Sequence, residues 1–355
     1  MSEIDRLGHA LWVVPVGEIG GVARHVLDAT RVGVPGWRLT VLCPEGALAE
    51  RLRAQGSDVV VGDFGPQAGA WASRRTLASV ARDLQPDIVH SHLAYADIVN
   101  AWTRLPRGTR RYTTEHGIAG DDGVYHASGM HARAMALIHR ARFPRFDGVI
   151  AVSRATRDTM LLKWRVRRPI FVILNGVDPV HGAQLRRPTS RTGTRVLSLS
   201  RLASEKRIDK LIEAFALVLD DQPDATLVVA GEGPLRADLE HLASQLGVGD
   251  RVHFPGFVDP EDAMQAADVL VQLSIWENCS YTLLDAKARA LRVVASHVGG
   301  NAEILDPTEL VRDITVRSVA KAIRYAKKVE PSGHPTTNQM CAAIARSYGA
   351  GAGNA

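Results

Sequence analysis

Residues 274–305 read SIWENCSYTLLDAKARALRVVASHVGGNAEIL, and this stretch carries the main evidence for the fold. The apolar run at 269–273 predicts a buried strand that ends where the stretch begins. From about Ser280 the apolar positions take helical spacing, and residues 293–295 predict the next strand. A strand, a helix and a second strand in close succession are typical of an α/β domain.

Two acidic residues stand at the centre of this stretch. Glu277 falls in the loop after the strand, and Asp285 falls eight residues later, in the first turns of the helix. The start of a helix offers free N–H groups, and its dipole favours anions. We therefore expect the two carboxylates to flank a ligand whose phosphate groups rest on this helix start.

The chain as a whole alternates strands and helices in two halves. The first half runs from a strand at 9–16 to a strand at 170–174, and the second begins with a strand at 195–199. Between them, residues 179–194 are rich in Arg, Pro, Ser and Thr, which indicates a linker. A chain of 355 residues can form two domains with separate cores. We therefore predict an α/β domain at 1–178 and a second at 195–330.

Composition narrows the class of protein. The chain is 46% hydrophobic and 5% aromatic, as ordinary globular enzymes are, and no run reaches the length of a membrane span. The first ten residues lack the apolar region of a signal peptide. Three scattered cysteines predict neither a disulfide framework nor a metal cluster. We therefore expect a cytoplasmic protein.

Two glycine-containing loops and one pair of cations suit phosphate groups. Gly20 and Gly21 form a turn before a predicted helix, where the backbone can approach an anion closely. Their spacing does not fit the dinucleotide fingerprint G-x-G-x-x-G. Arg201 and Lys206 lie five residues apart before another predicted helix, as a diphosphate site requires. Residues 231–234 form a further close-approach loop.

Three histidines lie at the ends of predicted strands. For His90 and His92 we favour an interpretation in which they orient loops through hydrogen bonds over one in which they take part in chemistry. On the sequence pattern alone, His116 suits a hydrogen-bonded strand end and a functional residue equally well.

The motifs between about residues 11 and 305 resemble those of the retaining glycosyltransferases of family GT4, also called glycosyl transferase group 1. They also occur in the same order along the chain. Glu277 and Asp285 match the family's E-x7-E block, residues 298–304 its V-G-G-N-A-E-I loop, and residues 200–206 its S-R-L-x-x-x-K segment. Gly20, Gly21 and His25 match its GG-x-x-x-H loop. The resemblance implies the GT-B fold, in which two Rossmann-like domains face each other across a cleft. It also implies that the C-terminal helix, here 338–355, packs back on the first domain.

The resemblance implies a function and assigns roles to residues. The expected reaction moves a sugar from a nucleotide-diphosphate donor, UDP first among the nucleotides, to a hydroxyl of a small molecule or a lipid-linked glycan, with retention of configuration. We found no D-x-D motif in a suitable strand context, so we expect no metal and no cofactor. The matched residues are His116 and Glu277 for catalysis; Arg201, Lys206, Gly20 and Gly21 for the donor diphosphate; Asn278, Cys279 and Ser280 for the donor sugar; and Asp285, Gly231, Gly233, Phe254 and Val258 for the ribose and base.

The chain departs from the family pattern at three places. Asp285 replaces the usual Glu, residues 278–280 replace a Gly-Phe-Pro turn, and Ala290 replaces a glycine that commonly ends the helix. Because of the first two departures, the family pattern does not predict which sugar nucleotide is the donor. Two other functions remain: a sugar-nucleotide epimerase of the same fold, and a non-catalytic sugar-nucleotide-binding subunit. For the two carboxylates alone, a glycoside hydrolase is the structural rival.

Residues 126–146 predict a basic amphipathic helix. Its predicted apolar face holds Met130, Ala134, Leu137, Ile138 and Ala141, and its polar face holds Arg133, Arg140, Arg142 and Arg145. Such a helix can lie on a membrane surface or pack against the first sheet. The sequence leaves both interpretations open.

Overall fold

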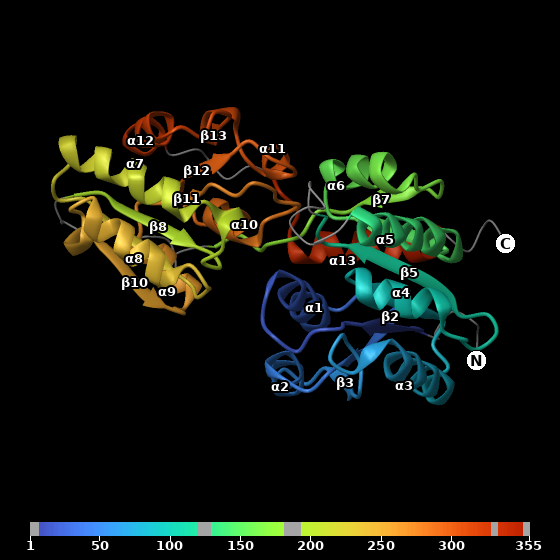
Figure 1. The fold of residues 1–355 in the computed structure, drawn as a ribbon. Coiled ribbons are helices and arrows are strands. Elements are labelled where there is room, and N and C mark those ends of the chain that lie inside the picture. Colours follow the sequence, from blue (N-terminus) through green and yellow to red (C-terminus); the bar gives the residue numbers. More distant parts are fainter. Residues whose placement is uncertain (1–6, 119–128, 181–192, 328–332, 351–355) are drawn as a thin grey trace. The chain divides into compact units, whose positions relative to one another are not determined.

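A computed structural model describes residues 7–118, 129–180, 193–327 and 333–350 (Figure 1). The chain divides into two compact units, one formed by Met1–Gly176 with Pro335–Ala355 and the other by Val177–His334. Most of the expected linker at 179–194, and the first residues of the helix expected at 126–146, lie outside the described residues.

The first unit is built on a parallel seven-stranded sheet with the strand order β3-β2-β1-β4-β5-β6-β7. Its strands are β1 (Gly8–Val13), β2 (Trp37–Cys43), β3 (Asp58–Val61), β4 (Ile88–His92), β5 (Arg110–Glu115), β6 (Gly148–Ala151) and β7 (Ile170–Val172). Its helices are α1 (Gly21–Val32), α2 (Ala47–Ala54), α3 (Gly69–Leu84), α4 (Ala94–Trp102), α5 (Gly129–Arg142), α6 (Arg154–Thr159) and α13 (Thr337–Ala350). The order changes direction between β1 and β4, which makes their carboxyl ends the expected ligand edge.

The second unit repeats this plan with a parallel six-stranded sheet in the order β10-β9-β8-β11-β12-β13. Its strands are β8 (Arg195–Leu199), β9 (Thr226–Ala230), β10 (Val252–Gly256), β11 (Val269–Gln272), β12 (Arg292–Ser296) and β13 (Leu310–Val311). Its α-helices are α7 (Ile208–Asp221), α8 (Arg236–Gln245), α9 (Pro260–Ala266), α10 (Tyr281–Ala288), α11 (Asn301–Ile304) and α12 (Val316–Arg324). Here the order changes direction between β8 and β11. The prediction of two Rossmann-like α/β domains is confirmed.

The C-terminal helix α13 belongs to the core of the first unit. Met340, Ile344 and Tyr348 are fully buried in the same cluster as Trp12 on β1. The Trp12 indole donates a hydrogen bond to the Tyr348 hydroxyl over 3.0 Å. Each large apolar side chain buried in this way stabilises the fold by about 1.5–3 kcal/mol. The last helix of the chain is therefore part of the N-terminal core.

Helix α4 was not predicted from the sequence. Its buried face carries Asp97 and Asn100 as well as alanines and Val99, so it lacks a clean apolar stripe. The Asn100 side chain donates to the Val89 carbonyl and to the Ser91 hydroxyl, and Thr113 donates to Asp97 over 2.7 Å. These hydrogen bonds use the side-chain N–H groups of Asn100 and one carboxylate oxygen of Asp97, and they hold α4 against β4 and β5.

The side chain of Arg142, expected on the polar face of α5, is instead completely buried. It lies 2.8 Å from Glu115 and 3.2 Å from Asp97, both also buried, and its guanidinium lies over the rings of Phe143 and Trp164. The prediction for the apolar face was also wrong, because Leu137, expected to be buried, is 64% exposed. Two buried carboxylates attract the one arginine inward, and this attraction overrides the helical pattern.

A second buried ion pair fixes α10 in the other unit. Lys287 is fully buried and contacts both carboxylate oxygens of Glu309 at 2.9 and 3.0 Å. Glu309 also accepts the backbone N–H of Asp306, which completes a capping box before β13. Loss of either charge would leave its partner buried and uncompensated, at a cost of about 3–5 kcal/mol.

None of the helices in the described part of the chain combines the length and apolar character needed to cross a bilayer.

The Arg142 cluster makes stability depend on pH. Burial raises the pKa of Glu115 from 4.5 to about 7, against the opposing effect of Arg142. Between these values the folded protein keeps a proton that the unfolded chain has lost, so the free energy of unfolding falls as pH rises from about 4.5 to about 7. The slope is at most about 1.4 kcal/mol per pH unit. Glu115→Gln should remove this contribution.

Denaturant titrations at several pH values between 4.5 and 8 check this prediction. The stability of Glu115→Gln relative to wild type should increase across that window and then become constant. Glu45→Gln, which changes a solvent-exposed carboxylate paired with Arg53, should show no such trend. Parallel pH profiles for wild type and Glu115→Gln would show that Glu115 is ionised throughout.

Candidate active site

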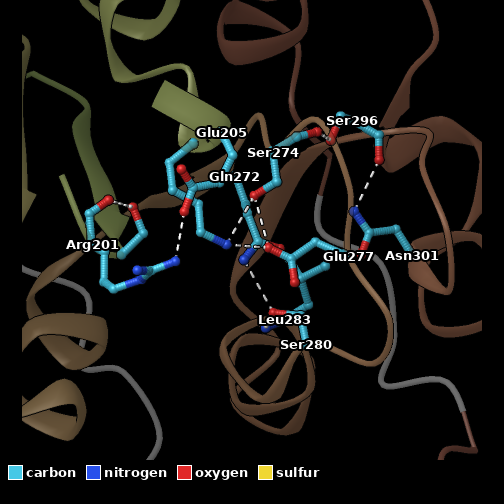
Figure 2. Close-up of polar contacts among 11 residues, drawn as sticks. Arg201, Glu205, Gln272, Ser274, Glu277, Ser280, Leu283, Ser296 and Asn301 are labelled. Atoms are coloured by element: carbon cyan, nitrogen blue, oxygen red, sulfur yellow. Dashed lines mark hydrogen bonds and ion pairs between the residues drawn. The ribbon is translucent and has the colours of Figure 1, made fainter. Parts of the chain in front are cut away.

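The change of direction in the second sheet brings two loops together. One follows β8 and carries Arg201 and Lys206, and the other follows β11 and carries Glu277. The Lys206 ammonium donates to Glu277 Oε1 over 2.6 Å, and the Ser274 hydroxyl donates to the same oxygen over 2.7 Å (Figure 2). The backbone N–H of Ile275 donates to the Glu205 carbonyl, which joins the loops directly. Two of the expected site residues thus form one ion pair.

Arg201 lies on the same loop but is arranged differently. Its side chain is 70% exposed and donates to Glu205 over 2.6 Å (Figure 2). The side chain of its partner Glu205 is only 11% exposed. The Arg201 guanidinium therefore remains accessible to a ligand while it contacts a largely buried carboxylate.

The start of α10 lies directly after Glu277. Ser280 is the N-cap residue, since its hydroxyl accepts the N–H of Leu283, and the Gln272 side chain donates to the same hydroxyl (Figure 2). Asn278, Cys279 and Ser280 are all buried, although they replace the turn usual in the family. The chain thus makes an ordinary capped helix start from a different sequence.

Gly299 and Gly300 hold the backbone of Glu277. The N–H of Gly300 donates to the Glu277 carbonyl over 3.3 Å, and a side chain at Gly299 would place its Cβ 1.8 Å from that oxygen. Gly299 also has a φ of +49°, in the left-handed region. The sequence analysis identified the double glycine only as part of a family motif. Its contact with Glu277 could be found only from the structure.

The glycines expected at the nucleotide make room for the Arg201 loop. A Cβ at Gly231 would lie 2.0 Å from the Ser200 carbonyl oxygen, and one at Gly233 would lie 2.4 Å from that of Leu202. Phe254 is half-buried and packs against the core of the unit. Val258 lines a groove of about 360 Å³ between α9 and strands β8 and β9.

Asp285 lies in the second turn of α10 and is buried. Its carboxylate lies 3.8 Å from the guanidinium of Arg289, which also contacts Glu261 at 3.2 Å. Ala290, at the end of this helix, adopts a φ of +51°. That value explains why a glycine is common at this position.

In the first unit, the loop after β1 ends at the start of α1. Gly20 is the N-cap residue, no side chain caps the helix, and the first turn holds no acidic residue. A Cβ at Gly20 would meet nothing within 4 Å, so packing does not require a glycine there. The open helix start retains backbone N–H groups that suit an anion.

Histidines gather at the same sheet edge. His92 at the end of β4 and His116 after β5 share a hydrogen bond of 2.9 Å between Nδ1 and Nε2. His25 on α1 lies against them, with its ring centroid 4.8 Å from that of His116, and its Nδ1 bonds Asn175 Oδ1 over 3.2 Å. Burial lowers the pKa of His25 to about 4 and the pKa values of His92 and His116 well below 6.5. Three neutral imidazoles thus meet where the sequence singled out only His116 as a site residue.

His90 makes structural hydrogen bonds, as the sequence analysis favoured, but its partners lie on a helix and a strand and not on a loop. One ring nitrogen bonds the Tyr348 hydroxyl and the other bonds Thr114 over 2.8 Å. Both of its nitrogens are therefore used in joining α13, β4 and β5.

Comparison with known proteins identifies the family. The model described as "Glycosyltransferase Family 4" matches residues 19–181, and the model described as "Glycosyl transferases group 1" matches residues 186–345. The alpha-monoglucosyldiacylglycerol synthase of Streptococcus pneumoniae is 30% identical over 234 residues, 61% of this chain and 53% of that protein. The 2-deoxystreptamine glucosyltransferase of Streptomyces kanamyceticus is 26% identical over 217 residues, 57% of this chain and 56% of that protein.

The matches therefore span about half the length of these curated relatives. Among solved structures, Anabaena Alr3699/HepE in complex with UDP and glucose superposes with a TM-score of 0.73 at 20% identity, covering 95% of this chain and 94% of that one. This likeness supports the GT-B architecture of two Rossmann-like domains. With both halves of the chain matched by the two family models, the protein belongs to the family 4, or group 1, glycosyltransferases.

Proposed function

We propose that this protein is a glycosyltransferase of the hexosyltransferase type, which moves a sugar from a nucleotide-diphosphate donor to an acceptor hydroxyl. The observation that carries the proposal is the Lys206–Glu277 ion pair beside the start of α10. A cation, a carboxylate and a set of backbone N–H groups meet where the strand order changes direction. That combination suits a sugar linked to a diphosphate.

The reaction needs positive charge where the diphosphate departs. As the bond between the sugar C1 and the phosphate oxygen breaks, negative charge grows on the leaving group. Lys206 and Arg201 supply two cations, and the start of α10 supplies backbone N–H donors. Since these groups provide the charge, we propose that transfer needs no metal ion.

Glu277 would act on the sugar, and its present contacts support this role. Lys206 and Ser274 both donate to Oε1, which fixes the carboxylate close to the proposed diphosphate position. A bound diphosphate would compete with Glu277 for Lys206. Glu277 could then accept hydrogen bonds from hydroxyl groups of the sugar. By the family resemblance, His116, neutral because of burial, would contact the donor sugar.

We further propose that the configuration at C1 is retained. In front-face attack, the acceptor oxygen bonds to C1 on the side from which the diphosphate leaves. The acceptor proton passes to the leaving phosphate oxygen, so no enzyme nucleophile is needed. This route agrees with a site whose charged groups serve the leaving group.

The comparisons favour particular classes of donor and acceptor. A structural neighbour is described in complex with UDP and glucose, which favours a UDP-sugar. One relative is named for a glycolipid product and another for an aminocyclitol acceptor. We therefore propose a small-molecule or lipid-linked acceptor in natural-product or glycolipid biosynthesis.

A surface of the first unit suits peripheral contact with a membrane. Leu137 and Ile138 on α5 are exposed, and so are Leu161 and Leu162 in the π-helical turn Met160–Trp164 that follows α6. The stacked rings of His139 and Trp164 join the two segments. Exposed arginines at 140, 165, 167 and 168 surround these leucines. Apolar side chains with a basic rim favour an anionic lipid surface, which we place on the cytoplasmic side.

Product analysis tests the central proposal. Incubation with UDP-sugars and an acceptor panel should release free UDP, and excess EDTA should leave the rate unchanged. Glu277→Gln should lower turnover at least tenfold while UDP still binds, because its contact is made mainly in the transition state. Asp285→Asn should instead raise the Michaelis constant and weaken UDP binding.

Other reaction products would indicate one of the alternative functions. An isomeric sugar nucleotide would indicate an epimerase, and UDP binding without turnover would indicate a binding subunit. A folded Glu277→Gln variant with wild-type turnover would contradict the role of Glu277. A melting curve for each variant establishes first that it is folded.

Lys206→Ala tests the diphosphate site by itself. Loss of one charge-assisted contact should raise the dissociation constant for UDP about tenfold in calorimetry. Lys210→Ala is the matched control, since Lys210 lies on α7 and pairs with Glu213. Equal affinities for wild type and Lys206→Ala would remove Lys206 from the site.

The membrane proposal is tested by sedimentation with vesicles. Leu162 is 82% exposed, so Leu162→Ser should reduce binding to vesicles that contain phosphatidylglycerol several-fold without a change in melting temperature. Trp71→Ser is the control, since Trp71 is 73% exposed on α3, outside this surface. Unchanged binding of Leu162→Ser, or an equal loss with Trp71→Ser, would contradict the assignment.

A further inference from the structure

Three histidines of the first unit converge from separate segments of the chain. His25 comes from α1, His92 from the end of β4, and His116 from the residue after β5. One ring nitrogen from each lies within 4.8 Å of the other two. Three nitrogens bound to one zinc ion at about 2.0–2.1 Å in tetrahedral geometry lie about 3.4 Å apart. The widest separation in the cluster would therefore have to close by up to about 1.4 Å, through rotation of the imidazole side chains, for all three to coordinate.

The protonation states suit a metal. Metal ions bind the neutral imidazole, and a protonated ring must first lose its proton. Burial lowers the pKa of all three rings, so they are neutral at pH 7. The site needs no pH change to become competent for binding.

Hydrogen bonds point lone pairs into the cluster. The side-chain oxygen of Asn175 can only accept, so His25 Nδ1 carries the proton and His25 Nε2 carries the lone pair. A hydrogen bond of this kind behind a ligand is typical of histidine metal sites. His92 Nδ1 and His116 Nε2, 2.9 Å apart, share one proton. An ion placed between them would move that proton to the far nitrogen of the same ring, so both imidazoles stay neutral.

The surroundings hold the cluster in place. The ring of His92 lies 4.6 Å from that of Trp12 and 4.5 Å from that of His90. His90 is excluded as a ligand, because both of its nitrogens are hydrogen-bonded to Tyr348 and Thr114. His116 is only partly buried, which gives an ion a path of entry.

We propose that His25, His92 and His116 form a binding site for a divalent transition-metal ion, with Zn²⁺ as the best fit. Imidazole nitrogen suits Zn²⁺, and three protein ligands leave a fourth position for water or solute. The bound ion would inhibit glycosyl transfer, because it takes His116 away from the sugar. The inhibitory effect rests on the proposed function, but the metal site itself does not.

Calorimetric titration of ZnCl₂ into chelator-treated protein without nucleotide tests the site. One saturable site per chain is expected. His25→Gln and His92→Gln should each raise its dissociation constant about tenfold or more. His253→Gln, which changes an exposed histidine on β10 of the other unit, should leave it unchanged. The absence of a saturable site, or wild-type affinity in His92→Gln, would overturn the proposal.

A measurement on the wild type covers the case in which a variant does not fold. Zinc X-ray absorption of the one-to-one complex should show scattering from three imidazole rings. A shell of oxygen ligands with fewer than two imidazoles would overturn the site. If Zn²⁺ binds there and transfer continues at the same rate, the inhibitory role is wrong while the site stands. If no transfer is found under any condition, the binding results still decide the site.

Discussion

The parallel pairing of the strands in the described part of the chain is the constraint on which the rest of the structure depends. Because parallel strands end at the same edge of a sheet, each sheet offers its loops on one side only. In both sheets the strand order changes direction once, between β1 and β4 and between β8 and β11. The loops on either side of that point cannot be covered by a crossover helix. The histidine cluster lies at this edge of the first sheet, and the Lys206–Glu277 pair lies at this edge of the second sheet. Within each group, residues that are far apart in sequence come together because their strands are close in the sheet.

Periodicity in the sequence predicted this framework, because buried parallel strands are short apolar runs separated by helices. The same signal failed where polar side chains replaced apolar ones in the interior. Helix α4 was missed because Asp97 and Asn100 interrupt its buried face, and Arg142 was placed on the wrong face because arginine is normally exposed. In both cases a partner from another segment satisfies the buried group, and such a partner is invisible in a local window.

The candidate site was predictable to the extent that each part lies within one motif. Lys206 and Glu277 were expected to serve one ligand, and the structure shows them in contact at 2.6 Å. The contacts of Gly299 with Glu277 and of His25 with His92 were not expected. They join residues from separate segments of the chain, so no spacing rule contains them. The contact of Asp285 with Arg289 is different, because the two residues are four apart on α10 and helical spacing brings them together. The sequence singled out His116 and not its neighbours because it showed each histidine separately.

The two units differ in the charge of the side chains at their sheet edges. The loops at the edge of the second sheet hold cations and carboxylates, with the Arg201 side chain 70% exposed and the side chains of Lys206 and Glu277 17% and 13% exposed. A charged ligand can therefore reach Arg201 directly, whereas it has to replace Glu277 as the partner of Lys206. The edge of the first sheet holds imidazoles that burial keeps neutral, and neutral rings can donate or accept hydrogen bonds without attracting a counterion. Under the proposed function, Lys206 and Arg201 meet the charge of the diphosphate, and the histidines serve uncharged hydroxyl groups of the sugar. Burial of the histidines suits this division, because a neutral imidazole can bind a hydroxyl group without adding a charge beside the open start of α1.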